Sequence, residues 1–172
     1  MPNLSGRLPF TSVVEETGLR ADDVVVLLAA VPERVNDLVA GLDEPRLAYR
    51  HAPAFPTVKE VVGHLCEAGS AVDALLRHAY LDRQRELRVR ASIDPGPEMD
   101  LSPPLPDLLQ NFARVRRRTV DLLRGLSEAD WRQPVFDPEQ GRLTLLEVCG
   151  QVTRHELGHL SQLRNLTALL PE

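Results

Sequence analysis

Apolar residues recur at intervals of three and four along most of the chain, which is the spacing of an amphipathic helix. The first such segment runs from about Ala21 to Gly41, and its apolar positions are Val25, Leu28, Val31, Val35, Leu38 and Leu42. Pro32 lies inside this segment and can kink or restart the helix, because proline lacks an amide hydrogen. No segment keeps the two-residue alternation of a strand. The pattern predicts an all-α protein.

Two capping boxes mark the beginnings of later helices. Thr57 and Glu60 in TVKE, and Thr144 and Glu147 in TLLE, have the Thr-x-x-Glu spacing in which each side chain bonds the other residue's backbone N–H. The first box predicts a helix that reaches about Leu81. The second box predicts the last helix of the chain.

Five prolines between Ile93 and Asp107 prevent a continuous helix in that segment. We expect an extended crossover there, followed by a third helix over about Leu105–Leu126. The four segments together predict a four-helix bundle with short outer joins and one long crossover between the second and third helices. In such a bundle the second and fourth helices can face each other.

Length and charge narrow the class of protein. A chain of 172 residues with 43% hydrophobic residues can bury one core, so we expect a single domain over 1–172. The longest apolar run, Val24–Val31, is too short to span a membrane, and no leader-like segment opens the chain. We therefore expect a cytoplasmic protein without a membrane partner, and the net charge of −5 disfavours nucleic acid. Cys66 and Cys149 lie far apart, and we expect both to be small buried residues.

The last predicted helix contains HELGH, in which His155 and His159 lie one turn apart, about 6 Å along the axis. This sequence fits the H-E-x-x-H pattern of zinc peptidases. A peptidase of this kind needs a third ligand downstream, where only Glu172 offers one, and Gln162 stands where the extended motif has glycine. A peptidase is therefore disfavoured.

A third histidine changes the interpretation of this pair. His64 lies in the middle of the second helix among apolar residues, where an imidazole needs a partner. If the second and fourth helices face each other, His64, His155 and His159 can form a three-nitrogen metal site. The alternative is that the pair is solvated or bonded to the backbone, and that His64 is a neutral core residue.

Four segments carry a family resemblance: LDEPRLAYRHAP, TVKEVVGHL, EADWRQPVFDPEQGRLTLLEV and RHELGHLSQLR. Over about Val24–Leu170 the chain resembles the DinB or YfiT-like superfamily of metal-binding four-helix bundles. The resemblance implies that His64, His155 and His159 bind a divalent metal and that the protein forms a homodimer. Some members use the metal to activate the thiol of mycothiol, bacillithiol or glutathione, and others are described as metal-dependent hydrolases.

The chain also departs from the family in two places. Phe55 and Pro56 precede the second helix, where many relatives have a tryptophan. Gln151 stands one turn before His155, where relatives often have another histidine. We therefore expect a change in the substrate or in the hydrogen bonds around the histidines.

Three neutral imidazoles leave a divalent ion with its full charge and at least one open coordination position. An ion of this kind lowers the pKa of bound water or holds a bound thiol as thiolate, so it activates a nucleophile. Nitrogen ligands suit zinc, nickel or iron, and the sequence does not choose among them.

Several other residues are candidates for the site. Glu67, on the same helical face as His64, is either a general base or a carboxylate that orients an imidazole. Glu156 is a weaker candidate for the base, because a solvated charge on the helix surface is the better explanation of it. Gln162, one turn after His159, either bonds a ligand imidazole or a substrate, or packs between helices. Arg114 and Arg118 share a helical face and can bind the carboxylates of a thiol cofactor if that face borders the pocket.

These observations predict a metal-dependent enzyme that transfers a low-molecular-weight thiol to a small electrophile. Two alternatives remain: a metal-dependent hydrolase, and a catalytically idle bundle that serves for metal binding or dimerisation.

Overall fold

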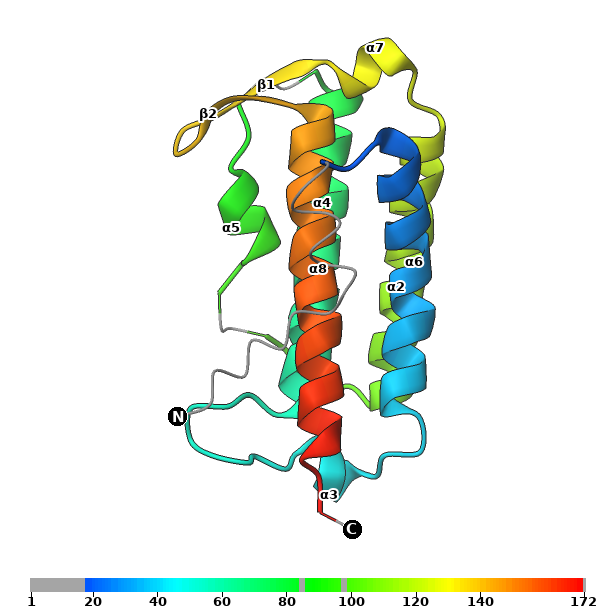
Figure 1. The fold of residues 1–172 in the computed structure, drawn as a ribbon, viewed down its shortest axis with the longest axis vertical. Coiled ribbons are helices and arrows are strands. Elements are labelled where there is room, and N and C mark those ends of the chain that lie inside the picture. Colours follow the sequence, from blue (N-terminus) through cyan, green and yellow to red (C-terminus); the bar gives the residue numbers. More distant parts are fainter. Residues whose placement is uncertain (1–17, 84–85, 97–98, 172) are drawn as a thin grey trace.

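The computed structural model describes residues 18–83, 86–96 and 99–171. The four long helices are α2 (Ala21–Val39), α4 (Val58–Tyr80), α6 (Leu105–Arg124) and α8 (Leu145–Ala168). Figure 1 shows α2 and α8 running in one direction and α4 and α6 in the other. Each of α2 and α4 packs against both α6 and α8, so α6 and α8 lie diagonally across the bundle. The predicted four-helix bundle is confirmed.

The outer joins are long, which corrects the expectation that they would be short. Residues 40–57 join α2 to α4 and contain the short helix α3 (Glu44–Leu47). Residues 125–144 join α6 to α8 and contain α7 (Glu128–Trp131) and an antiparallel hairpin, whose strands are β1 (Pro134–Asp137) and β2 (Gly141–Thr144). Each of these joins is long because it connects two diagonally opposite helices. The hairpin was not predicted, because its two strands are too short to show an alternating pattern.

The predicted crossover joins α4 to α6, and it contains the short helix α5 (Val89–Ile93). After α5 the crossover packs against α4 close to His64. A Cβ atom built on Gly63 would lie 2.5 Å from Leu101 Cδ2 and 3.1 Å from Met99 Sδ. Glycine at position 63 therefore lets the crossover approach the helix beside a candidate metal ligand.

The capping residues in the sequence correctly predicted where α4 and α8 begin. Both predicted capping boxes form, Thr57 with Glu60 and Thr144 with Glu147. α2 continues through Pro32 rather than restarting there.

The buried apolar residues form two clusters, one towards the hairpin end of the bundle and one towards α3. On α8 the first cluster ends at Val152 and the second begins at Leu157, and the buried Glu156 lies between them. On α6 the buried Arg116 lies in the corresponding gap, between Phe112 and Val120. A polar layer therefore divides the core at mid-height.

Candidate metal centre

The imidazoles of His64, His155 and His159 converge between α4 and α8. His155 Nε2 lies 3.2 Å from His64 Nε2 and 3.0 Å from His159 Nε2. The ring planes are inclined to one another by 58° to 79°, so the rings meet through their nitrogen atoms rather than by stacking. The structure therefore brings together the three histidines that the sequence singled out.

This arrangement fits a bound divalent ion. A tetrahedral ion with metal–nitrogen bonds of about 2.0–2.1 Å holds neighbouring ligand nitrogens about 3.3 Å apart, close to the two separations found here. Among the described residues, the group that can hold an ion consists of these three histidines alone, without a cysteine or a carboxylate. An ion bound here would have three histidine ligands, and no Cys, Asp or Glu side chain of the described residues would occupy its remaining coordination position.

The surroundings keep two of the imidazoles neutral, as metal ligation requires. Burial, together with the neighbouring His159 and His64, lowers the pKa of His155 to about 4, although Asp94 opposes this shift. Burial also lowers the pKa of His159. At neutral pH both rings have a nitrogen lone pair available for an ion.

Gln162 orients one of these rings. The Nδ1 atom of His159 lies 2.8 Å from Gln162 Oε1, and because an amide oxygen only accepts hydrogen bonds, Nδ1 carries the proton. The Nε2 atom, which faces the other two histidines, then has the lone pair. Of the three roles considered for Gln162, the structure therefore shows the bond to a candidate ligand imidazole.

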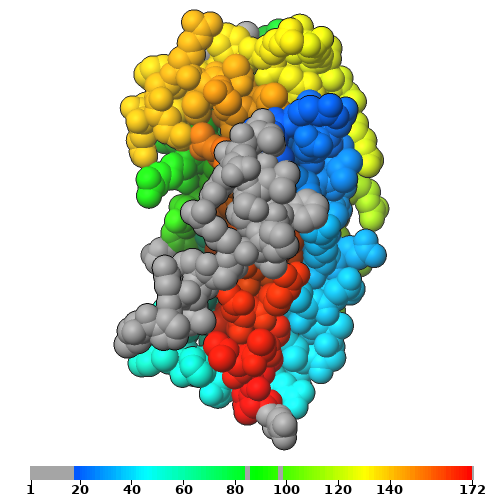
Figure 2. Space-filling view, viewed as in Figure 1, coloured from blue at the N-terminus to red at the C-terminus, as the bar shows by residue number. Residues whose placement is uncertain are grey.

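A cleft with a volume of about 520 Å³ opens beside His155. Ile93 and Asp94 of the crossover line it, so this segment borders the site. The other lining residues come from α5, from the turn between β1 and β2, and from α8: Arg90, Glu139, Gln140, Gln151 and Arg154. Figure 2 shows α5 and the hairpin on the same side of α8. Sequence reasoning missed these lining residues as site candidates, apart from Gln151.

Gln151, one turn before His155, is hydrogen-bonded to another amide. Its Nε2 donates to Gln140 Oε1 at 2.8 Å, and Gln140 Nε2 donates to Gln151 Oε1 at 3.3 Å. The two amides therefore link α8 to the hairpin at the edge of the cleft.

Glu156 has a different environment from the one predicted. Its exposed fraction is 1%, and its carboxylate pairs with Arg116, which is 2% exposed, across the centre of the bundle. Burial raises the pKa of Glu156, and the guanidinium of Arg116 opposes this shift. Because Glu156 is neither a solvated surface charge nor open to the cleft, the structure does not support a role for it as general base.

Glu67 and the two arginines also lie outside the cleft. Glu67 is exposed on α4, and the described residues give it no hydrogen-bond partner, so its role stays a prediction. Arg118 donates to Asp73 Oδ2 at 2.7 Å, and Arg114 donates to Asn111. Both arginines line a groove on the α4–α6 side of the bundle, so their face does not border the cleft at His155.

Both cysteines are buried, and burial raises the pKa of each thiol to about 12. The predicted role as small buried residues is thus confirmed, and neither thiol is a nucleophile at neutral pH.

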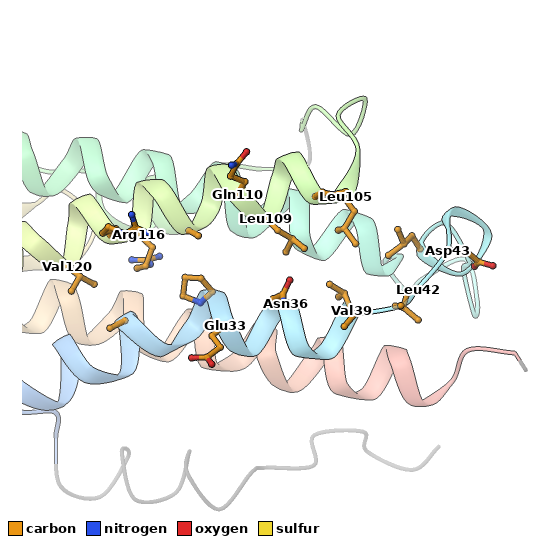
Figure 3. A pocket seen from close by; sticks show the side chains of 18 of the residues that line it. Glu33, Asn36, Val39, Leu42, Asp43, Leu105, Leu109, Gln110, Arg116 and Val120 are labelled. Carbon is orange, nitrogen blue, oxygen red and sulfur yellow. The ribbon is translucent and has the colours of Figure 1, made fainter.

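A second groove, with a volume of about 1010 Å³, lies between α2 and α6. Figure 3 shows Arg116 extending from α6 into the space between the two helices, with Glu33 and Asn36 on α2. None of the three histidines lines this groove, so we place the candidate centre at the cleft beside His155.

Comparison with known proteins agrees with this fold. The model of the DinB superfamily matches residues 27–163, and the chain belongs to this superfamily. Among solved structures, the chain is similar to YfiT from Bacillus subtilis, described as a probable metal-dependent hydrolase with an unusual four-helix bundle topology. The two chains are 19% identical, the match covers 89% of this chain and 90% of YfiT, and the TM-score is 0.66. No curated protein matches the chain at a significant level.

None of the helices in the described part of the chain is long and apolar enough to cross a membrane.

Proposed function

We propose that the protein is a divalent-metal-dependent enzyme that uses the His64–His155–His159 centre to transfer a low-molecular-weight thiol to a small electrophile. The observation that carries this proposal is the convergence of three Nε2 atoms on one point, without a cysteine or carboxylate in the group. A divalent ion held there by neutral ligands lowers the pKa of a thiol or water molecule, and so supplies a nucleophile at neutral pH.

The chain's own residues then position the reactants and accept a proton. Asp94 lines the cleft and influences the pKa of both His155 and His159, so we assign it the role of general base in place of Glu67 and Glu156, which do not line the cleft. In the transfer, the thiol proton passes to the Asp94 carboxylate, the sulfur forms a bond to the electrophilic carbon, and the leaving group departs with its electron pair. Gln162 holds His159 in the required tautomer.

Assays with one electrophile and several thiols test this proposal. The protein, loaded in turn with Zn²⁺, Ni²⁺ or Fe²⁺, is incubated with monochlorobimane and with mycothiol, bacillithiol or glutathione. We expect conjugation above the background rate with at least one thiol, and its loss in His64→Ala. Asp94→Asn should slow conjugation without changing the metal content. If no thiol is conjugated in a metal-dependent way, the transferase proposal is wrong.

A hydrolase is the second candidate, and the similarity to YfiT favours it. Such an enzyme would cleave ester or amide substrates with metal but without added thiol, which separates the two activities. If purified protein contains no metal and none binds on titration, both proposals fail and the catalytically idle bundle is correct.

A further inference from the structure

Two arginines that border the cleft have no side-chain partner among the described residues. Arg90 on α5 and Arg154 on α8 are exposed, and among the described residues neither forms an ion pair or a side-chain hydrogen bond. By contrast, Arg77 and Arg118 on the other side of the bundle both pair with Asp73. An unpaired guanidinium keeps all its N–H donors for a ligand, and its fork of donors matches a carboxylate.

The side chain of Arg154 is folded back along α8. A Cβ atom built on Gly150, one turn earlier in α8, would lie 3.5 Å from Arg154 Nη1. The guanidinium therefore lies back over Gly150, towards the hairpin end of the helix, rather than extending away from the protein. Gln151, which also lines the cleft, follows directly in the chain.

A buried carboxylate holds in place the wall of the cleft that α5 and the hairpin turn form. Asp137, 1% exposed, accepts hydrogen bonds of 2.8 Å from the backbone N–H groups of Glu139 and Gln140 in the hairpin turn, and another of 2.8 Å from Val89. Val89 begins α5 and directly precedes Arg90. One side chain thus holds the turn and the start of α5 together, and the Gln140–Gln151 pair joins this unit to α8. The segments that carry the two arginines are therefore held in position before a ligand binds.

We propose that this cleft binds a small carboxylate-bearing molecule, whose carboxylate contacts Arg90 and Arg154 while its reacting atom lies at the histidines. The volume of about 520 Å³ is within the range of about 300–1,000 Å³ typical of small-molecule sites. Asp94 and Glu139 line the same cleft, and their negative charges offset the positive charges of the two arginines. The cleft therefore disfavours a polyphosphate, which carries several negative charges. The inference rests on the proposed metal centre and names the class of its substrate.

Two thiols that differ in a carboxylate provide the test. The protein is loaded with Co²⁺, and its visible absorption is followed during titration with 3-mercaptopropionate or with 2-mercaptoethanol. We expect 3-mercaptopropionate to bind about tenfold more tightly, because charge-assisted hydrogen bonds to the guanidinium groups add to the sulfur contact. In Arg90→Gln/Arg154→Gln this preference should fall to about twofold or less, with the affinity for 2-mercaptoethanol unchanged.

Arg164→Gln is the matched control, because Arg164 is also exposed on α8 but does not line the cleft. It should retain the wild-type preference, and circular dichroism checks that all variants are folded. Equal affinities of the wild-type protein for the two thiols, or an unchanged preference in the double variant, would overturn the inference while leaving the metal centre intact. If the wild-type protein takes up no Co²⁺, the proposed function fails, and the inference fails with it.

Discussion

The ion pair between Arg116 and Glu156 has an unusual position for two charged side chains. It joins α6 to α8 across the diagonal of the bundle, within the polar layer between the two apolar clusters. Arg116 Nε, Arg116 Nη1 and Glu156 Oε2 have no hydrogen-bond partner among the described residues. Buried charges cost desolvation energy, and a pair with unsatisfied atoms recovers it only partly.

Removing one partner of this pair should therefore lower the free energy of unfolding much more than replacing both partners. We expect Glu156→Gln to lower the free energy of unfolding by about 3–5 kcal/mol, because it leaves the guanidinium buried without its counter-charge. Arg116→Met/Glu156→Leu should recover most of this loss. Denaturant unfolding followed by circular dichroism measures both effects.

The exposed pair between Arg132 and Glu128 supplies the control for this prediction. Glu128→Gln should leave the unfolding midpoint nearly unchanged, because solvated pairs contribute little. A Glu156→Gln protein as stable as the wild type would show that the buried pair has no such role.

At the scale of elements, Asp137 connects α5 to the hairpin, and its charge makes this connection sensitive to acid. Burial acts to raise the pKa of Asp137, but the three backbone N–H donors outweigh it and lower the pKa below the usual 3.8. The folded state therefore favours the ionised carboxylate more than the unfolded state does. Its contribution to stability is fully present above the unfolded pKa and is lost as the pH falls through the folded pKa.

We expect Asp137→Asn to lower the free energy of unfolding at pH 7 by about 1–3 kcal/mol, because at least one buried backbone donor loses its acceptor. The difference between variant and wild type should shrink as the pH falls below 3.8. Thermal unfolding of both proteins over a series of pH values measures this. A difference that is independent of pH would show that the negative charge of Asp137 does not stabilise the fold.

At the scale of the whole molecule, two exposed apolar side chains, on α2 and just after α8, are candidates for a dimer interface. Val24 and Leu166 are buried in the core, whereas Val26 on α2 is 67% exposed and Leu169 is 36% exposed. An exposed valine on a helix face can contribute to a shared surface in a two-fold dimer.

The homodimer implied by the family resemblance stays a prediction. Light scattering during size-exclusion chromatography should give about twice the monomer mass of 19.1 kDa. If the α2 face is part of the interface, Val26→Glu should shift the population towards monomer, whereas Phe136→Glu on the hairpin should not. A monomeric mass at every concentration would contradict the dimer.

The sequence by itself determined the features that depend on near neighbours along the chain. Helical periodicity and the two capping boxes fixed the long helices, since both arise from contacts within one or two turns. The spacing of His155 and His159 placed them on one face of α8, and the apolar setting of His64 indicated a partner in the bundle.

Only the tertiary structure decided which helix faces meet. Because α6 lies diagonally opposite α8, Glu156 points into the core at Arg116, and Arg114 and Arg118 lie on a different side from the cleft. Arg90, Asp94 and Gln140 reach the cleft from a short helix, a crossover and a turn that have no periodic pattern. Their positions depend on contacts between residues far apart in the sequence, such as that of Asp137 with Val89, and hydrophobic spacing does not specify such contacts.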